Sequence, residues 1–197
     1  MINKGVIHRS AVISEDGQFR YALRRVWDES APLVLFVGLN PSFADADLDD
    51  NTSTICINYA KRWGYGGLLL GNLFAYRSTD PTRLYETSDP VGQENDHWLK
   101  DLQAQSKLVV CAWGAGGCYQ NRDTTVLSFL QNPHCLTILK KGYPGHPLYK
   151  RADLKPMRYT FAPLRDPAPL PSLPTNQGAP DINGACATGA SRSTYVQ

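Results

Sequence analysis

The chain of 197 residues is long enough for one domain with a substantial core and too short for two. Hydrophobic residues make up 42% of it and charged residues 19%, which favours a globular protein over a disordered one. The formal net charge of only +2 excludes a chain that is basic throughout, although a local basic patch can bind phosphates whatever the sum.

The five cysteines lie apart from one another, and the chain has no Cys-x-x-Cys pair, so the spacings of zinc ribbons and iron–sulfur proteins are absent. An odd count without a signal peptide predicts reduced thiols in a cytoplasmic protein. The longest apolar runs are much too short to cross a bilayer. We therefore expect a soluble chain that has no membrane contact and binds neither a metal nor a cofactor.

The N-terminal segment predicts a β-hairpin, because Asp16-Gly17 lies between an apolar pair and the alternating residues Phe19, Tyr21 and Leu23. Four continuous apolar runs follow, as is typical of strands covered on both faces: Leu33–Leu39, Leu68–Phe74, Leu108–Ala112 and Leu136–Leu139. Segments with helical spacing lie between them: Thr52–Trp63, Gly92–Ser106 and Tyr119–Leu130. This alternation predicts an α/β fold with three layers (αβα), in which helices cover both faces of a central parallel sheet of four strands.

The composition changes after Phe161, where six of the 14 prolines gather and apolar periodicity ends. Such a segment buries too little apolar surface to offset the entropy lost on ordering. We therefore expect residues 1–161 to form the domain and residues 162–197 a flexible tail.

The residues that follow the predicted strands are candidates for a site, because ligands gather at the carboxyl ends of strands in open α/β sheets. Asn40-Pro41 follows the first strand, and an acidic loop with Asp45, Asp47, Asp49 and Asp50 comes next. An amide fixed at this position can orient a water or bond to the edge of a base. The alternative is that Asn40 only closes a turn through its own backbone.

Asn72 lies in the second strand, and Phe74 and Tyr76 follow it on the face expected to be opposite Leu73. An amide beside an aromatic plane is what a pocket for a planar heterocycle requires, although either ring alone is as easily a core residue. Gly114 follows the third strand, where glycines before a helix permit a phosphate to approach the backbone closely.

The segment after the fourth strand, Lys140–Arg151, is the most informative of the chain. His146 lies between Gly145 and Pro147, which restrict its backbone, and the segment carries four cations and interleaved tyrosines, as a site for a bent phosphate backbone requires. The alternative is a surface loop without a function.

Two of these motifs resemble the uracil-DNA glycosylase superfamily. Residues 38–42, Gly-Leu-Asn-Pro-Ser, resemble the water-activating motif of its mismatch-specific and single-strand-selective members, and residues 145–149 resemble its His-Pro-Ser loop in shortened form. Residues 68–77 and 109–114 are similar to its base-reading strand and its Leu-Trp-Gly strand. The run from Leu39 to Asp50, with residues 61–67, also identifies the chain as a member of a bacterial and phage family known only as a domain of unknown function.

The resemblance implies a monofunctional DNA glycosylase that turns a base out of DNA and hydrolyses its N-glycosidic bond. Asn40 would position the attacking water, His146 would stabilise the charge that grows on the base, and Asn72 would bond to the polar edge of the base. The strongest uracil enzymes have Asp at the position of Asn40, so a loop carboxylate, Asp45, is expected to take over water activation.

The same resemblance implies the remaining contacts. Ser42, Phe74 and Tyr76 would complete the base pocket, and Leu148 or Tyr149 would fill the space that the base leaves. The DNA backbone would lie against Gly114, Lys141, Lys150 and Arg151. The acidic loop and the shortened His loop favour a modified pyrimidine over uracil, and we expect a monomer that acts in repair or in defence against phage.

Two other functions fit the same residues. The first is a module that binds a flipped base or nucleotide without catalysis, and the second is a hydrolase of free nucleosides or nucleotides, which the modest net charge would suit. Abasic sites in treated DNA would separate a glycosylase from both.

Overall fold

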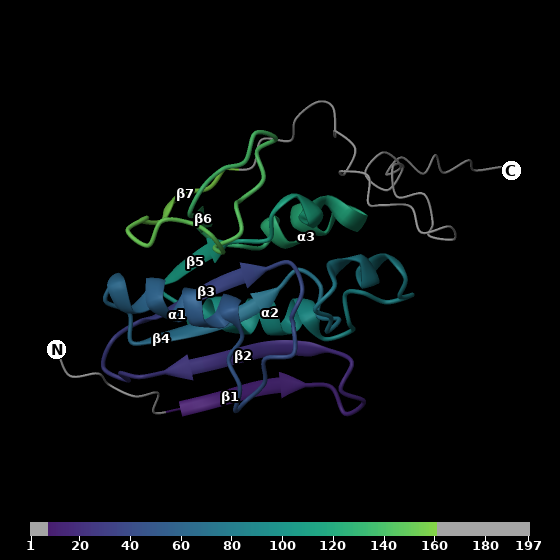
Figure 1. The fold of residues 1–197 in the computed structure, drawn as a ribbon, viewed down its shortest axis with the longest axis horizontal. Coiled ribbons are helices and arrows are strands. Elements are labelled where there is room, and N and C mark those ends of the chain that lie inside the picture. The colour runs from purple at the N-terminus through teal and green to yellow at the C-terminus, as the bar shows by residue number, and fades with distance from the viewer. Residues whose placement is uncertain (1–7, 161–197) are drawn as a thin grey trace, which may run out of the picture.

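A mixed sheet of seven strands forms the centre of the protein, in the order β1-β2-β4-β3-β5-β6-β7 (Figure 1). The structure is a computed structural model that describes residues 8–160, so the predicted tail lies outside the described residues. The strands are β1 (His8–Ile13), β2 (Arg20–Val26), β3 (Leu33–Gly38), β4 (Gly67–Asn72), β5 (Leu108–Cys111), β6 (His134–Cys135) and β7 (Met157–Arg158). The helices are α1 (Asn51–Arg62), α2 (Asn95–Ala104) and α3 (Arg122–Leu127), with 3₁₀ segments at Pro81–Tyr85 and Ala115–Asn121.

The fold is α/β, as predicted, but the prediction of a four-stranded parallel sheet was wrong. Strands β4, β3, β5 and β6 are parallel and form the middle of the sheet. The predicted hairpin β1–β2 is present, and it extends this sheet because β2 pairs antiparallel with β4, with Leu23 opposite Leu70. Strand β7 adds a seventh member, antiparallel to β6.

The fourth parallel strand also lies upstream of its predicted position. The prediction was Leu136–Leu139, whereas β6 is His134–Cys135. The apolar run leaves the sheet because it pairs with its own loop: Leu139 N donates to Tyr143 O at 2.8 Å, and Ile138 bridges to Pro144.

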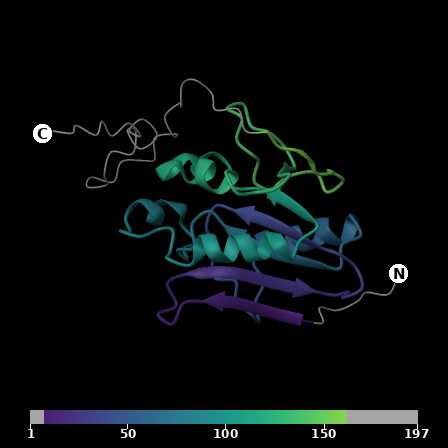
Figure 2. The same ribbon diagram turned by 180° about the vertical axis from the view of Figure 1, so that it is seen from behind.

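Helices cover both faces of the sheet, since successive residues of β3 enter two different cores. Val34 and Phe36 pack in the cluster that contains the buried residues of α1, whereas Leu35 and Val37 pack in the cluster that contains those of α2 and α3. The two opposite views show α1 on one side of the sheet and α2 on the other (Figures 1 and 2). In the part of the chain that the structure describes, no helix is long and apolar enough to cross a membrane.

Candidate functional site

The predicted site residues come together at one edge of the sheet, where the four parallel strands end. Asn72 is the last residue of β4, Asn40 follows β3, Gly114 follows β5, and His146 lies in the segment after β6. Backbone hydrogen bonds hold that segment at the edge, from Gly114 N to Pro144 O (2.9 Å) and from Gly145 N to Thr137 O (2.7 Å). Because only β5 separates β3 from β6, the two strand ends are about 10 Å apart.

Asn40 is fixed by its amide group. Its Nδ2 donates to Ser78 O at 2.9 Å, and Ser78 N donates back to Pro41 O at 2.9 Å. The amide nitrogen therefore closes the junction between two loops, and it does so through the side chain and not through the backbone of Asn40, as the alternative interpretation had it. Among residues 8–160, however, none donates a hydrogen bond to Asn40 Oδ1, so this oxygen can accept one from a water or a ligand.

Asn72 is buried and contacts Arg20, a residue that the sequence analysis missed. Arg20 Nη2 lies 3.5 Å from Asn72 Oδ1, and Arg20 Nη1 donates to Ala44 O at 2.7 Å. Burial lowers the pKa of Arg20 to about 10 although the Asp50 charge opposes this, so the guanidinium stays charged at neutral pH. The carbonyl oxygen of Asn72 thus already faces a cation. Three of the seven residues of β2 are arginines, Arg20, Arg24 and Arg25, and this was the signal that could have identified it.

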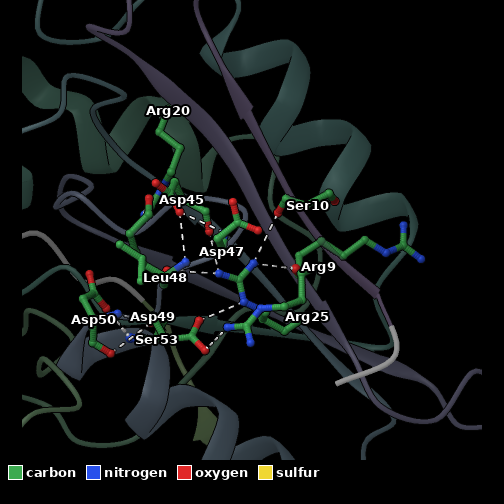
Figure 3. A network of polar contacts seen from close by, with 12 residues as sticks. Arg9, Ser10, Arg20, Arg25, Asp45, Asp47, Leu48, Asp49, Asp50 and Ser53 are labelled. Carbon is green, nitrogen blue, oxygen red and sulfur yellow. Dashed lines mark hydrogen bonds and ion pairs between the residues drawn. The ribbon is translucent and has the colours of Figure 1, made fainter. Parts of the chain in front are cut away.

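The carboxylates of the acidic loop have separate roles (Figure 3). Asp45 Oδ1 accepts the backbone N–H groups of Asp47 and Leu48, both at 2.9 Å, and these bonds lower the pKa of Asp45. Asp49 pairs with Arg25 at 2.8 Å and also with Arg9. Asp45, the carboxylate predicted to activate water, therefore shapes a turn of its own loop.

Asp50 is the loop carboxylate that lies beside Ser42. The Ser42 hydroxyl donates to Asp50 Oδ2, and Asp50 Oδ1 caps helix α1 by accepting from Ser53 N at 2.7 Å. Burial works against ionisation of Asp50, but the bonds from Ser42 and Ser53 and the charge of Arg20 outweigh it, and the pKa of Asp50 is lowered. Asp50 is therefore an anion at neutral pH, and each of its oxygens retains a lone pair for a ligand.

His146 is partly buried and lies within electrostatic range of Asp50. Burial lowers the pKa of His146, the Lys150 charge acts in the same direction, and the Asp50 charge opposes them. Leu148 N donates to Nδ1 at 3.3 Å, so the neutral ring carries its proton on Nε2. At neutral pH, His146 can therefore donate a hydrogen bond from Nε2 without first gaining a proton.

The two predicted stacking rings pack in the core or against it. Phe74 is completely buried, 5.7 Å from the ring of Tyr119, and Tyr76 packs at the margin of the same core. Leu73 lies in that core too, so the expectation that Phe74 and Tyr76 point away from it was wrong. The reason is that β4 ends at Asn72, and the alternation of faces ends with it.

An open pocket of about 400 Å³ lies beside Ser42 and Asp50 instead, and sequence reasoning had not singled out its aromatic wall, Phe43. The Phe43 side chain is 60% exposed, and the guanidinium of Arg77 stacks over its ring at 5.6 Å. The lining residues are Ser42, Phe43, Ala44, Leu48, Asp49, Asp50, Asn51, Thr52 and Thr79. Among them are an aromatic plane, an aliphatic side chain, carboxylates and hydroxyl groups.

The segment around His146 exposes cations and one aromatic ring. Lys141, Lys150 and Arg151 are exposed, and Arg151 pairs with Asp153 at 2.7 Å. Tyr149 is 99% exposed and has a φ of 60°, whereas Leu148 is partly buried. Tyr59 Oη donates to Arg151 O at 2.7 Å, which anchors the segment to α1.

Gly114 does not offer the predicted phosphate site. Its φ of 70° requires a glycine, but its N–H donates to Pro144 O, and the helix that follows is a 3₁₀ segment with a kink. Helix α3 begins only at Arg122. The backbone N–H that was expected to meet a phosphate is therefore already used within the protein.

The model of a family described as a protein of unknown function (DUF1643) matches residues 20–148, well over half of the chain. No curated protein and no solved structure matches the chain.

Proposed function

The chain belongs to the DUF1643 family, and we propose that it acts as a monomeric DNA glycosylase that excises a modified pyrimidine and leaves an abasic site. Two observations support the proposal. The motifs around Asn40 and His146 resemble those of uracil-DNA glycosylases, and both lie at the carboxyl edge of the same sheet. The observation that carries it is the pair of groups available there: an acceptor at Asn40 Oδ1 and a neutral donor at His146 Nε2.

In the proposed reaction, the C1′–N bond breaks and its electron pair leaves with the base. His146 Nε2–H donates to the base oxygen that becomes negative, and such a preorganised donor accounts for about 10²–10³ in rate. Asn40 Oδ1 holds a water beneath C1′. The water adds to C1′, and its proton ends on the released base.

Asp50 takes the carboxylate role in this proposal in place of Asp45. Its lowered pKa makes it a weak proton acceptor, but it keeps the negative charge at neutral pH. A fixed anion stabilises a sugar that becomes cationic as its glycosidic bond breaks. We therefore assign Asp50 an electrostatic role that acts on the sugar through space, without a contact to it, and leave the water to Asn40.

The segment around His146 supports a polymeric substrate over free nucleosides. A fully exposed tyrosine with a left-handed backbone makes no contribution to the core, and such conformations persist where they serve a function. Tyr149 is suited to fill the space of an extruded base, and the cations of Lys141, Lys150 and Arg151 to bind the flanking phosphates. We assign the wedge to Tyr149 in preference to the partly buried Leu148.

The test is base release from oligonucleotides that carry a panel of natural and modified pyrimidines. Mass spectrometry detects the free base, and alkali cleaves the abasic site. His146→Ala should reduce release by two to three orders of magnitude, about 10²–10³, whereas His97→Ala, at an exposed position on α2, serves as the matched control. Failure of every DNA in the panel to lose a base would overturn the proposal, and release from free nucleosides alone would favour a nucleoside hydrolase.

A further inference from the structure

The loop between β3 and α1 exposes two large hydrophobic side chains on one pocket. Phe43 is 60% exposed and Leu48 is 66% exposed, and both line the pocket that contains Ser42 and Asp50. Exposed apolar side chains that gather around a concave site, with polar groups between them, indicate a ligand. Neither Phe43 nor Leu48 has a role in the reaction proposed above.

Two buried arginines of β2 hold this loop (Figure 3). Arg20 Nη1 donates to Ala44 O at 2.7 Å. Arg25 Nη2 donates to Asp45 O at 2.6 Å and to Leu48 O at 3.2 Å, and Arg25 Nε donates to Asp49 at 2.8 Å. The two arginines of β2 therefore fix, at several points, the backbone that carries Phe43 and Leu48. A surface loop that only connects two elements needs no such support, whereas the walls of a binding pocket do.

The polar groups of the pocket define the hydrogen bonds that a ligand can make. Asp49 is already paired with Arg25 and Arg9, so Asp50 is the carboxylate that retains capacity to accept. Thr79 also lines the pocket. A ligand seated against Phe43 therefore meets an anionic acceptor, which favours a donor on the ligand and disfavours a carbonyl or a carboxylate.

We infer that this pocket binds a pyrimidine that stacks on Phe43 and carries a hydrogen-bond donor, a hydroxyl or amine on its substituent, which bonds to Asp50. The volume of about 400 Å³ is within the range of small-molecule sites, about 300–1,000 Å³, and leaves space for a substituent beside the ring. The inference rests on the proposed function for its choice of a nucleobase. It replaces the buried Phe74 with Phe43 as the stacking surface, and it names the class of substituent that the site selects.

Binding of single-stranded oligonucleotides tests this without requiring catalysis. The probes are identical except for one position, which carries cytosine, 5-methylcytosine or 5-hydroxymethylcytosine, and fluorescence anisotropy gives the dissociation constants of the full chain. The hydroxymethyl probe should bind about tenfold more tightly than the methyl probe, because these two differ by one donor to a charged acceptor. Equal affinities for the two probes would overturn the inference.

Two variants assign the effect to its residues. Asp50→Asn keeps the helix cap, since Asn caps as well as Asp, but should reduce the preference for hydroxymethyl to less than about threefold. Phe43→Ala should weaken binding of all three probes by about tenfold through loss of stacking. Met157→Ala, at a side chain that is 46% exposed on β7, is the matched control. The inference would be overturned if Asp50→Asn kept the wild-type preference for hydroxymethyl and Phe43→Ala kept the wild-type affinity.

The two proposals fail in different ways. If the chain prefers the hydroxymethyl probe and Phe43→Ala weakens it, but no DNA loses a base, the proposed catalysis is wrong and the pocket stands. If base release occurs and Phe43→Ala leaves KM unchanged, the glycosylase stands and the pocket assignment is wrong.

Discussion

Arg25 offers the most direct test of how the pocket loop is held. Its side chain is completely buried, and its guanidinium donates to Asp49, to the carbonyl oxygens of Asp45 and Leu48, and to Arg24 O at 2.9 Å. Arg25→Met keeps a long apolar stem and removes every one of these bonds. Each lost hydrogen bond to a carbonyl oxygen reduces the free energy of unfolding by about 1 kcal/mol, and a bond to a charged partner contributes about 1.5–3 kcal/mol when it is fully buried.

The total loss is smaller than for a fully buried ion pair, because Asp49 is partly exposed and retains Arg9. Three carbonyl bonds of about 1 kcal/mol each and a reduced contribution of about 1 kcal/mol from Asp49 give an expected loss of about 4 kcal/mol in the free energy of unfolding for Arg25→Met. In a domain of this size, that loss lowers Tm by about 8–16 °C. Chemical denaturation and thermal melting measure both. Arg24→Met is the matched control: the neighbouring arginine makes an exposed bond to Gln105 and should change stability by less than about 0.5 kcal/mol. Equal stability of the two variants would refute the claim that Arg25 organises the loop.

Three further predictions concern the segment around His146. The pKa of His146 is lowered in the folded protein, so the unfolded chain takes up this proton at a higher pH than the folded chain, and the free energy of unfolding should fall as pH drops below the ordinary value of 6.5. His146→Gln should flatten this part of the stability curve, and an unchanged slope in the variant would contradict the prediction. Tyr149→Asn should leave stability unchanged or slightly higher, since Asn tolerates a positive φ, but should weaken DNA binding, and unaltered affinity would exclude the wedge role. Lys150→Gln should reduce the salt dependence of single-strand binding by about 0.7 in the log–log slope, and an unchanged slope would show that Lys150 contacts no phosphate.

The central strands were predictable because their signal is continuous. Runs of apolar residues predicted β3 and β5 to within one residue at either end, and helical spacing predicted α1 equally well. The outer parts of the sheet carried less information. β6 and β7 are two residues long, which is below what any periodicity can reveal, and the hairpin β1–β2 gave no local sign that it would join the same sheet.

The sequence predicted that Asn40 and His146 lie at one edge of the sheet, but it predicted less well what the individual side chains contact. Asn40 and His146 follow strands, and the rule for open sheets brought them to one edge. The choice between Asp45 and Asp50 depended on which carboxylate the turn uses for its own N–H groups, and the sequence does not contain that information. Phe74 was selected because it follows Asn72 by two residues. Strand β4 ends at Asn72, however, and beyond the end of a strand the alternation of faces no longer predicts where a side chain points.

The near-neutral net charge also has a different meaning once the ion pairs are known. The carboxylate of Asp49 is paired with Arg9 and Arg25, and that of Asp50 is close to the buried Arg20, so much of the acidic loop is neutralised within the fold. The cations of Lys140, Lys141, Lys150 and Arg151 are exposed in the segment that follows β6 at the same edge of the sheet. Because binding of a polyanion depends on the local field, we expect this segment to bind phosphates as a basic protein would, despite a total of +2.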